Sequence, residues 1–421
     1  MTEFATYPHP TSDDYLLDLI APLRDQDAGL NAETALAAFT RAAWTGVSEP
    51  GDRHAGAVIA ALGPEAIFAL TAGAEREVLE RIEAAGLVEV VSDPSEWRAA
   101  LDRWRPRHDL ERAAQDCRNA AKLGLRLLIP GDADWPEQLG DLGDRAPHAL
   151  WVRGKVAALG ACAQSVALVG ARACTDYGQR VTGDLAAGAV DRGFAIVSGG
   201  AYGVDAMAHR AALASAGATV AVCAGGVDRL YPSGNHELFM RLIERGAMIS
   251  ELPVGQAPQR WRFVQRNRLI AALSQVTVVV EAGQRSGALH TARDALEIGR
   301  GVGAVPGPVT SAASMGCHDL LRGGLAELIT SPDELAQLWR EHTAPAGWAG
   351  GEEITMPLFT LAARPSDHAV RVRDALGVRS WRGVDELAAR AGLTASQVRA
   401  ALTELDLAGE AVESAGRWRR S

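Results

Sequence analysis

Apolar residues in the first 120 positions recur at helical spacing. Trp97, Leu101 and Trp104 stand at i, i+4 and i+7, which places them on one face of a helix, and the stretch 110–121 repeats this pattern. Proline–glycine steps at 50–51 and 63–64 interrupt the pattern and mark turns. We predict a helical N-terminal domain over residues 1–120.

From Ser165 onward the pattern changes to short apolar runs of mostly β-branched residues, separated by segments with helical spacing. Strands that are buried on both faces and alternate with helices are typical of a doubly wound, mostly parallel α/β sheet. Two further runs, at 125–129 and 149–152, lead into this region. We therefore predict one α/β domain over residues 121–340, with its main strands near 166–169, 194–197, 218–222, 247–250, 276–280 and 302–305.

The last eighty residues show a third pattern. Residues 341–366 are rich in Gly, Ala and Pro, which is typical of a linker. Three segments with helical spacing follow, and Thr394 with Gln397 predicts a capping box at the start of the third. A short hairpin closes the chain. Three helices followed by a hairpin predict a winged-helix domain over 367–421.

Composition limits the class of protein without naming its function. Hydrophobic residues make up 48% of the chain and charged residues 22%, so a disordered or fibrous protein is excluded. No apolar run approaches the roughly 18 residues needed to span a bilayer, the start lacks a basic-then-apolar leader, and the five cysteines show no CxxC pair. We expect a cytoplasmic protein without a membrane span, a metal site or a cofactor.

The net charge of −10 disfavours nucleic-acid binding, but the charge is unevenly distributed. Acidic residues are concentrated in the first third of the chain. Residues 165–340 hold 16 Lys and Arg against 15 Asp and Glu. The α/β domain is therefore nearly neutral, and a local cationic surface remains compatible with the overall charge.

Glycines follow five of the predicted strands. Gly170 and Arg172 come after the first, and Gly199, Gly200 and Gly203 come after the second. In an open parallel sheet these loops line one crevice, where glycines let backbone N–H groups approach an anion. A glycine that only serves a tight turn is the competing interpretation for each loop alone. Neither GxxxxGK[ST] nor a strict GxGxxG after the first strand is present, so a Walker-type nucleotidase and a dinucleotide oxidoreductase are disfavoured.

Residues 260–268 combine four arginines with two aromatic residues and no acid. Arginine bridges phosphates bidentately, and an aromatic face offers a surface on which a base can stack. Single-stranded nucleic acid requires both properties, so this segment predicts a binding loop beside the crevice. The alternative is a solvated helix start whose aromatic residues belong to the core.

Several polar residues allow two interpretations. Arg172 is an anion ligand in the crevice or a partner of Asp176. Asp205 and His209, at i and i+4, form a proton-transfer pair or are a helix cap and a buried histidine. Glu281 ends a strand at the crevice, where enzymes place a base, but it has no evident carboxylate partner.

Seven motifs in order resemble the DNA-processing protein A family, DprA, also called Smf. They are GAR (170–172), SGGAYGVDAMAH (198–209), GGVDRLYPSGN (225–235), SELP (250–253), FVQRNRLIAALS (263–274), VVVEAGQRSGALHTARDALEIGR (278–300) and VPGP (305–308). The resemblance implies a Rossmann-like sheet flanked by a small helical domain and an optional winged helix. Together with the arginine–aromatic segment, it implies a binding site for single-stranded DNA (ssDNA) made of Gly170, Arg172, Gly199, Gly200, Gly203, Arg262, Phe263, Arg266, Asn267, Arg268, Ser286 and Gly287.

The resemblance also implies a function without catalysis. Proteins of this family bind and protect ssDNA and help load the RecA recombinase onto it, often as homodimers, as in natural transformation. We expect Arg172→Glu or Arg266→Glu to weaken binding and leave the fold intact. Ser233 departs from relatives that often carry a basic residue there, and Arg229 or Arg262 could replace the lost charge.

Two other functions stay open. Phosphoribohydrolases on a related fold use a PGGxGTxxE loop, but this chain has SGALHTA with Glu281 before the loop. A scaffold that recruits RecA without touching DNA is the second alternative. The winged helix carries one acid in excess over residues 341–421, so we expect it to pack against the core or a protein rather than read duplex DNA, although Arg417, Arg419 and Arg420 keep DNA contact possible.

Overall fold

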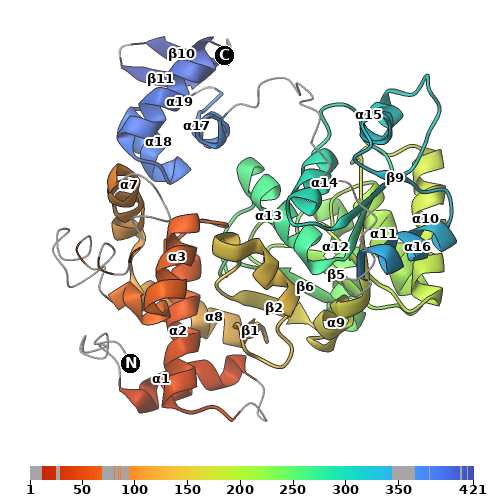
Figure 1. The fold of residues 1–421 in the computed structure, drawn as a ribbon. Helices are drawn as coiled ribbons and strands as arrows, with labels where there is room; N and C mark the ends of the chain where they lie inside the picture. Colours follow the sequence, from red (N-terminus) through yellow and green to blue (C-terminus); the bar gives the residue numbers. More distant parts are fainter. Residues whose placement is uncertain are drawn as a thin grey trace.

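A computed structural model describes residues 12–24, 29–68, 94–343 and 366–421 of the chain, apart from positions 379, 408, 409 and 415, together with residues 80, 84 and 86. Most of the predicted linker, residues 344–365, lies outside this description. The described chain forms an N-terminal group of helices, a large α/β domain and a C-terminal group of three helices with a hairpin (Figure 1).

The N-terminal helices are amphipathic and enclose an aromatic core. Asn31 and Thr34 form a reciprocal capping box that starts the second helix. The Trp44 and Trp104 rings pack edge to face with centroids 5.3 Å apart, and Trp97 is fully buried beside them. The helices are α1 (Asp13–Ile20), α2 (Ala32–Val47), α3 (Arg53–Leu62), α7 (Pro94–Trp104) and α8 (Leu110–Lys122).

The α/β domain is built on a nine-stranded sheet with strand order β1-β2-β6-β5-β4-β3-β7-β8-β9. The seven strands from β6 to β9 pair in parallel, whereas β1 and β2 pair antiparallel at one edge. The strands are β1 (Arg126–Leu128), β2 (Leu150–Gly154), β3 (Ser165–Val169), β4 (Ala195–Ser198), β5 (Thr219–Val222), β6 (Ala247–Ser250), β7 (Val276–Val279), β8 (Gly301–Ala304) and β9 (Glu327–Leu328). The predicted doubly wound, mostly parallel sheet is confirmed.

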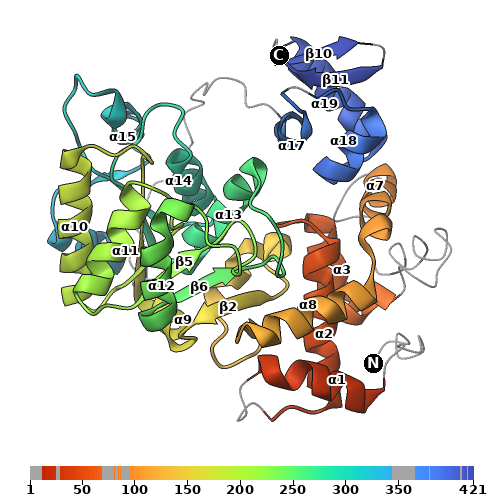
Figure 2. The ribbon, with the colours of Figure 1, turned by 180° about the vertical axis from the view of Figure 1, so that it is seen from behind.

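Helices cover both faces of this sheet because its central strands are apolar on both sides. One face packs against α10 (Asp176–Asp191), α11 (Val204–Ala214) and α16 (Pro332–Thr343). The other packs against the short α9 (Ala157–Gly160), α13 (Arg260–Leu273), α14 (Ala288–Glu297) and α15 (Met315–Arg322). Helix α12 (His236–Arg245) packs with β5, β6 and α11. Figure 2 shows the same layers from behind.

The winding of the sheet reverses at β3. The chain runs from β3 outward through β4, β5 and β6, and then returns through α13 to β7, on the other side of β3. In open α/β sheets a crevice forms at such a switch point, outside the carboxyl ends of the strands. Here that crevice lies beside the loops that follow β3, β4 and β7.

The C-terminal residues form the predicted winged-helix arrangement, with its own apolar core. Thr394 and Gln397 make the expected capping box at the start of its third helix. In both views this domain lies beyond the α3 and α7 end of the N-terminal helices (Figures 1 and 2). Its elements are α17 (Asp367–Ala375), α18 (Val384–Ala391), α19 (Ala395–Leu407), β10 (Ala411–Ser414) and β11 (Arg417–Arg420).

Candidate nucleic-acid interface

A crevice of about 1000 Å³ opens at the switch point of the sheet. We call it the switch-point crevice. Its lining comes from the loops after β3, β4 and β7, from Tyr231 between β5 and α12, and from α11, α13, α14 and α17. The described lining residues include six arginines against two carboxylates, and the arginines are Arg172, Arg260, Arg266, Arg285, Arg371 and Arg373. The crevice is therefore cationic in a chain whose net charge is −10.

Three of the five glycine-containing loops line this crevice. Gly170 contributes from the loop after β3, and Gly283 and Gly287 contribute from the loop after β7. The loop after β4 contributes Ala201. The loops 223–226 and 306–308, after β5 and β8, do not belong to its lining. The predicted convergence of glycine loops is thus restricted to the strands beside the switch point.

Arg172 is one of three exposed arginines in the described lining of the crevice, with Arg260 and Arg285. It lies in the loop after β3, and its side chain is exposed. Among the described residues, neither Asp176 nor any other carboxylate forms an ion pair with it. The guanidinium carbon lies 5.1 Å from the centroid of the Phe263 ring. This distance is typical of a cation–π contact, which holds the guanidinium over the ring and leaves its edge free for phosphate oxygens.

Phe263 lines the crevice and does not belong to the core. Its ring centroid lies 5.7 Å from that of Tyr231, whose side chain is 53% exposed. The two rings are tilted by 52°. Tyr231 is exposed and Phe263 is half-buried, and this pair beside a free arginine offers stacking surface and charge together, as unpaired bases on a phosphate backbone require.

Arg266 also contacts the Phe263 ring, but its side chain is buried. Its guanidinium carbon lies 5.9 Å from the Phe263 centroid, and its exposed fraction is 5%. Its Nη1 donates to the carbonyl oxygens of Gly199, at 2.8 Å, and Val222. Burial lowers the pKa of Arg266, and the nearby Asp205 carboxylate opposes that shift. Arg266 therefore fixes the loop after β4 and adds positive charge to the crevice floor.

Glycine is required at several predicted positions for steric reasons. A Cβ on Gly199 would collide with the Arg266 guanidinium, and one on Gly170 would lie 2.6 Å from Val204 Cγ2. Gly203 has φ +75°, and its Cβ would collide with the backbone carbonyl of Ala171. Gly200 has φ +68° and packs against Phe239. These glycines bring the loops after β3 and β4 into contact.

The start of α14 forms the opposite wall of the crevice. Asn267 Nδ2 donates to the Gly287 carbonyl oxygen at 3.3 Å, which ties this loop to α13. Ser286 and Gly287 line the crevice, and Gly287 is exposed. The first-turn N–H groups of α14 already have acceptors: Ala288 donates to Ser286 Oγ at 3.4 Å, Leu289 to the Ser286 carbonyl oxygen at 3.2 Å and His290 to the Gly287 carbonyl oxygen at 3.1 Å.

Five predicted residues are not among the lining residues of the crevice: Gly199, Gly200 and Gly203, which shape the loop after β4, and the two arginines Arg262 and Arg268. Arg268 is fully buried and forms two 2.6 Å hydrogen bonds to the Glu251 carboxylate. Arg262 is 6% exposed and lies 3.3 Å from Glu49, on the opposite side of α13. Each guanidinium pairs with a buried carboxylate and does not face the switch-point crevice. For the same reason Arg262 cannot replace a basic residue at Ser233.

The residues with possible catalytic roles have structural partners. Asp205 Oδ2 accepts hydrogen bonds from the backbone N–H groups of Gly199 and Ala201 at 3.2 and 3.3 Å. His209 is fully buried, with Nδ1 2.7 Å from Thr219 Oγ1. Burial lowers the pKa of His209 to about 3. The predicted buried histidine therefore describes His209 better than proton transfer does, whereas Asp205 binds the loop after β4 and does not cap α11, which has no side-chain cap.

Glu281 is likewise committed to the fold. Its carboxylate accepts from the N–H of Thr175 at 2.8 Å and from the Thr175 hydroxyl at 2.6 Å. The side chain is 2% exposed and does not line the crevice. It connects the end of β7 to the start of α10 and is not positioned as a base.

Helix α17 of the C-terminal domain closes one side of the crevice. Asp374 accepts a hydrogen bond from the Trp261 N–H at 3.1 Å, so it caps α13 from another domain. Gln265 Nε2 donates to Asp367 at 2.9 Å. The Arg371 guanidinium lies 4.3 Å from the Trp261 ring centroid. The expected packing of this domain against the core is observed.

The lining residues that sequence reasoning missed include an aromatic residue and four arginines: Tyr231, Arg260, Arg285, Arg371 and Arg373. The first three lie inside segments that the motifs had already marked. The last two belong to α17, and no pattern in the sequence indicates that this helix reaches the crevice.

Comparison with known proteins agrees with this architecture. Residues 126–340 match the family model described as DNA recombination-mediator protein A, and residues 360–417 match the DprA winged helix domain. The chain belongs to the DprA/Smf family.

Relatives of this DprA-family chain cover most of its length. A Mycobacterium tuberculosis protein named as a DNA processing protein DprA is 44% identical over 327 residues, which are 74% of this chain and 81% of that protein. Escherichia coli Smf is 37% identical, over 67% of this chain and 74% of its own. The crystal structure of Streptococcus pneumoniae DNA processing protein A superposes with a TM-score of 0.56 at 27% identity, covering 70% of this chain and 95% of that one.

Membership in the DprA/Smf family identifies the chain as a recombination mediator of DNA processing. Within the part of the chain that the structure describes, no helix is both long enough and apolar enough to cross a membrane.

Proposed function

We propose that this protein is a cytoplasmic, non-catalytic recombination mediator that binds ssDNA in the switch-point crevice. The phosphates of the strand bind to Arg172 and to the loop at Ser286–Gly287. Bases stack on Phe263 and Tyr231. In this mechanism the protein protects the strand and helps to load RecA, and it acts as a homodimer, as the family resemblance implies.

The observation that carries this proposal is the pairing of Arg172 with Phe263. A free, exposed guanidinium lies 5.1 Å from an aromatic ring, inside a crevice whose other charges are mostly arginines. This arrangement recognises features common to every nucleotide of a strand, namely its phosphate and its base face. Binding would therefore show little sequence preference.

The enzymatic alternative has less support. A phosphoribohydrolase requires a carboxylate at the reacting centre, and Glu281 is hydrogen-bonded to Thr175 outside the crevice. Release of free base from AMP by the purified protein would revive that alternative.

The test is the affinity of the Arg172→Glu variant for oligo-dT. We expect the charge reversal to lower affinity at least tenfold, because it removes a phosphate contact and adds repulsion beside the other contacts. Fluorescence anisotropy at two salt concentrations measures this, and an unchanged affinity would contradict the crevice as the binding site. Since Arg172 is exposed, the melting temperature serves as the control and should stay unchanged.

Arg266→Glu, the other charge reversal expected to weaken binding, is not a clean probe. It would place a second carboxylate beside Asp205 and remove the donors that hold the carbonyl groups of Gly199 and Val222. Loss of binding in that variant would report loss of structure, contrary to the expectation of an intact fold.

A further inference from the structure

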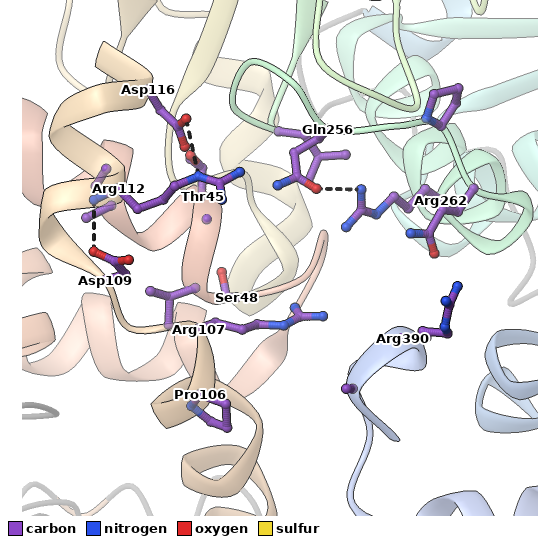
Figure 3. Close-up of a pocket in the computed structure, with 18 of the residues that line it drawn as sticks. Thr45, Ser48, Pro106, Arg107, Asp109, Arg112, Asp116, Gln256, Arg262 and Arg390 are labelled. Carbon is purple, nitrogen blue, oxygen red and sulfur yellow. Dashed lines mark hydrogen bonds and ion pairs between the residues drawn. The ribbon is translucent and has the colours of Figure 1, made fainter. Parts of the chain in front are cut away.

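A second hollow, of about 800 Å³, lies where the three domains meet. We call it the three-domain hollow. The N-terminal helices contribute α2, α8 and the turn at 105–107, and the α/β domain contributes the segment 252–262. The C-terminal domain contributes residues of α17, α18 and β11. Figure 3 shows this convergence, with α8 on one side, the loop of Gln256 on another and Arg390 on a third.

The lining of the three-domain hollow is rich in arginine. Its described residues include six arginines against three carboxylates; the arginines are Arg107, Arg112, Arg260, Arg262, Arg390 and Arg420. Figure 3 shows Arg107, Arg112 and Arg262 extending into the hollow from different elements. A cationic surface assembled from three domains is unexpected on charge alone, because the first third of the chain is acidic.

Intramolecular pairing compensates these arginines only in part. Glu49 binds both Arg107, at 2.5 Å, and Arg262, at 3.3 Å. Arg112 has a looser partner, Asp116, at 3.6 Å. Arg390 pairs with Glu386 at 3.1 Å. For Arg260 and Arg420, no described carboxylate lies within ion-pair distance, and the charge that acts on both is that of Asp374. Positive charge is therefore left over for a ligand.

One buried donor in this lining has no acceptor. Arg262 is 6% exposed, and its Nε forms no hydrogen bond with any described residue, although Nη1 donates to Gln256 at 3.1 Å. A buried donor without a partner destabilises the fold, because the loss of its hydration is not compensated. An anion in the hollow would supply the missing acceptor.

The chemistry of the walls selects phosphate rather than a base. Among the described lining residues there is no aromatic side chain, in contrast to Phe263 and Tyr231 in the switch-point crevice. Guanidinium groups bind phosphate oxygens in bidentate fashion without contacting a base. The hollow thus suits the charged part of a nucleotide and offers its base no stacking surface.

Arg260 connects the two sites, because it lines both the switch-point crevice and the three-domain hollow. We propose that the three-domain hollow is a second phosphate-binding site. Its phosphates come from a DNA strand that continues out of the crevice past Arg260, or from a free nucleotide. The first source rests on the ssDNA function proposed above, whereas the second does not.

The experiment compares two triple variants with equal loss of charge. R112Q/R390Q/R420Q removes arginines of the hollow whose carboxylate contacts are loose, exposed or absent. The control, R118Q/R399Q/R417Q, removes one arginine from α8 and two from the C-terminal domain, all outside both sites. Each protein is titrated with oligo-dT of about 6 nucleotides, within the range that one ssDNA groove holds, with oligo-dT several times longer, and with ATP.

If the phosphates come from a DNA strand, the affinity of the hollow variant for the long oligonucleotide depends less on salt than that of the wild type. Its affinity for the short oligonucleotide keeps the salt dependence of the wild type. For the long oligonucleotide, the slope of log affinity against log salt falls by about 2, because each phosphate contact on a single strand contributes about 0.7. For a free-nucleotide source, the hollow variant loses ATP binding while both DNA slopes stay as in the wild type. In each case the control variant behaves as the wild type.

Two results would overturn the proposal. In one, the two triple variants give the same slopes and the same ATP affinity. In the other, the wild type binds neither ATP nor the long oligonucleotide more tightly than the short one. A wild type that binds ATP at the hollow but neither oligonucleotide would instead refute the ssDNA function and leave the phosphate site standing.

Discussion

His209 illustrates at the scale of one residue how the floor of the site is stabilised. The ring is fully buried on α11, and its Nδ1 lies 2.7 Å from Thr219 Oγ1, which itself donates to the Ile196 carbonyl oxygen. Burial and the nearby Arg266 charge lower its pKa from 6.5 to about 3. The folded protein therefore keeps this imidazole neutral at pH values where the unfolded chain would protonate it.

This difference predicts acid sensitivity. Below about pH 6.5 the unfolded state binds a proton that the folded state excludes, so stability falls as the pH decreases toward 3, by up to about 1.4 kcal/mol per pH unit. The His209→Gln variant should lose less melting temperature than the wild type between pH 7 and pH 5. Some loss should remain, because burial also lowers the pKa of His148 to about 4. Parallel melting curves for the two proteins would contradict the assignment.

Single residues also mark the limit of prediction from sequence. Arg262, Arg266 and Arg268 stand in one arginine-rich segment, and composition treats them alike. Their roles differ because their partners are distant in sequence: Glu49 is 213 positions from Arg262. The family motif marks this segment as a whole, but only the fold distinguishes a cation that faces the crevice from one that holds two domains together.

At the scale of elements, the loops after β3 and β4 form one unit through Gly203. The positive φ of Gly203 turns the chain into α11, and the Val204 N–H donates to the Ala171 carbonyl oxygen at 3.2 Å. The backbone of Arg172 therefore depends on a glycine 31 positions later. A side chain at Gly203 would displace the loop that carries Arg172.

We therefore predict that Gly203→Ala lowers both stability and ssDNA affinity. The added Cβ collides with the Ala171 carbonyl and adopts a strained φ, so we expect a loss of at least about 1 kcal/mol and weaker oligo-dT binding. Gly183→Ala in α10 is the matched control. Its Cβ meets nothing within 4 Å, and alanine favours a helix by up to about 1 kcal/mol, so this variant should be at least as stable as the wild type. Equal melting temperatures for both variants would refute the steric argument.

Local patterns predicted most of the elements because each strand is a short apolar run between glycine turns. The exception is β9, Glu327–Leu328, whose two residues are exposed and carry no apolar pattern. The packing of α17 on α13 also escaped prediction. It depends on two carboxylates, Asp367 and Asp374, that resemble ordinary helix-surface residues until the facing donors are known.

At the scale of the whole molecule, Glu49 joins all three domains. Its buried carboxylate, from the N-terminal helices, contacts Arg107 of the same group and Arg262 of the α/β domain. Burial alone would raise its pKa, but the charges of Arg107, Arg262 and Arg371 outweigh burial and lower it. The ionised carboxylate is thus the common counterion of arginines from three domains.

Removing this charge should destabilise the assembly. In Glu49→Gln the buried arginines lose their counterion, and a loss of about 3–5 kcal/mol is expected, since breaking a buried pair leaves an uncompensated charge. Since the folded pKa is lowered, the stabilisation is present above the unfolded value of 4.5 and is lost as the pH falls through the folded pKa. Thermal unfolding at pH 7 measures the effect. Glu111→Gln, which breaks an exposed pair with Arg118, is the control and should change stability by less than about 1 kcal/mol.

Because α17 contributes two arginines to the switch-point crevice, binding of the strand is coupled to the position of a separate domain. A ligand that touches Arg371 or Arg373 as well as Arg172 binds better when α17 is seated than when it is displaced. Thermodynamic reciprocity then requires the bound strand to hold α17 in its seat by the same factor. Occupancy by DNA and attachment of the winged helix would be two manifestations of one cooperative equilibrium.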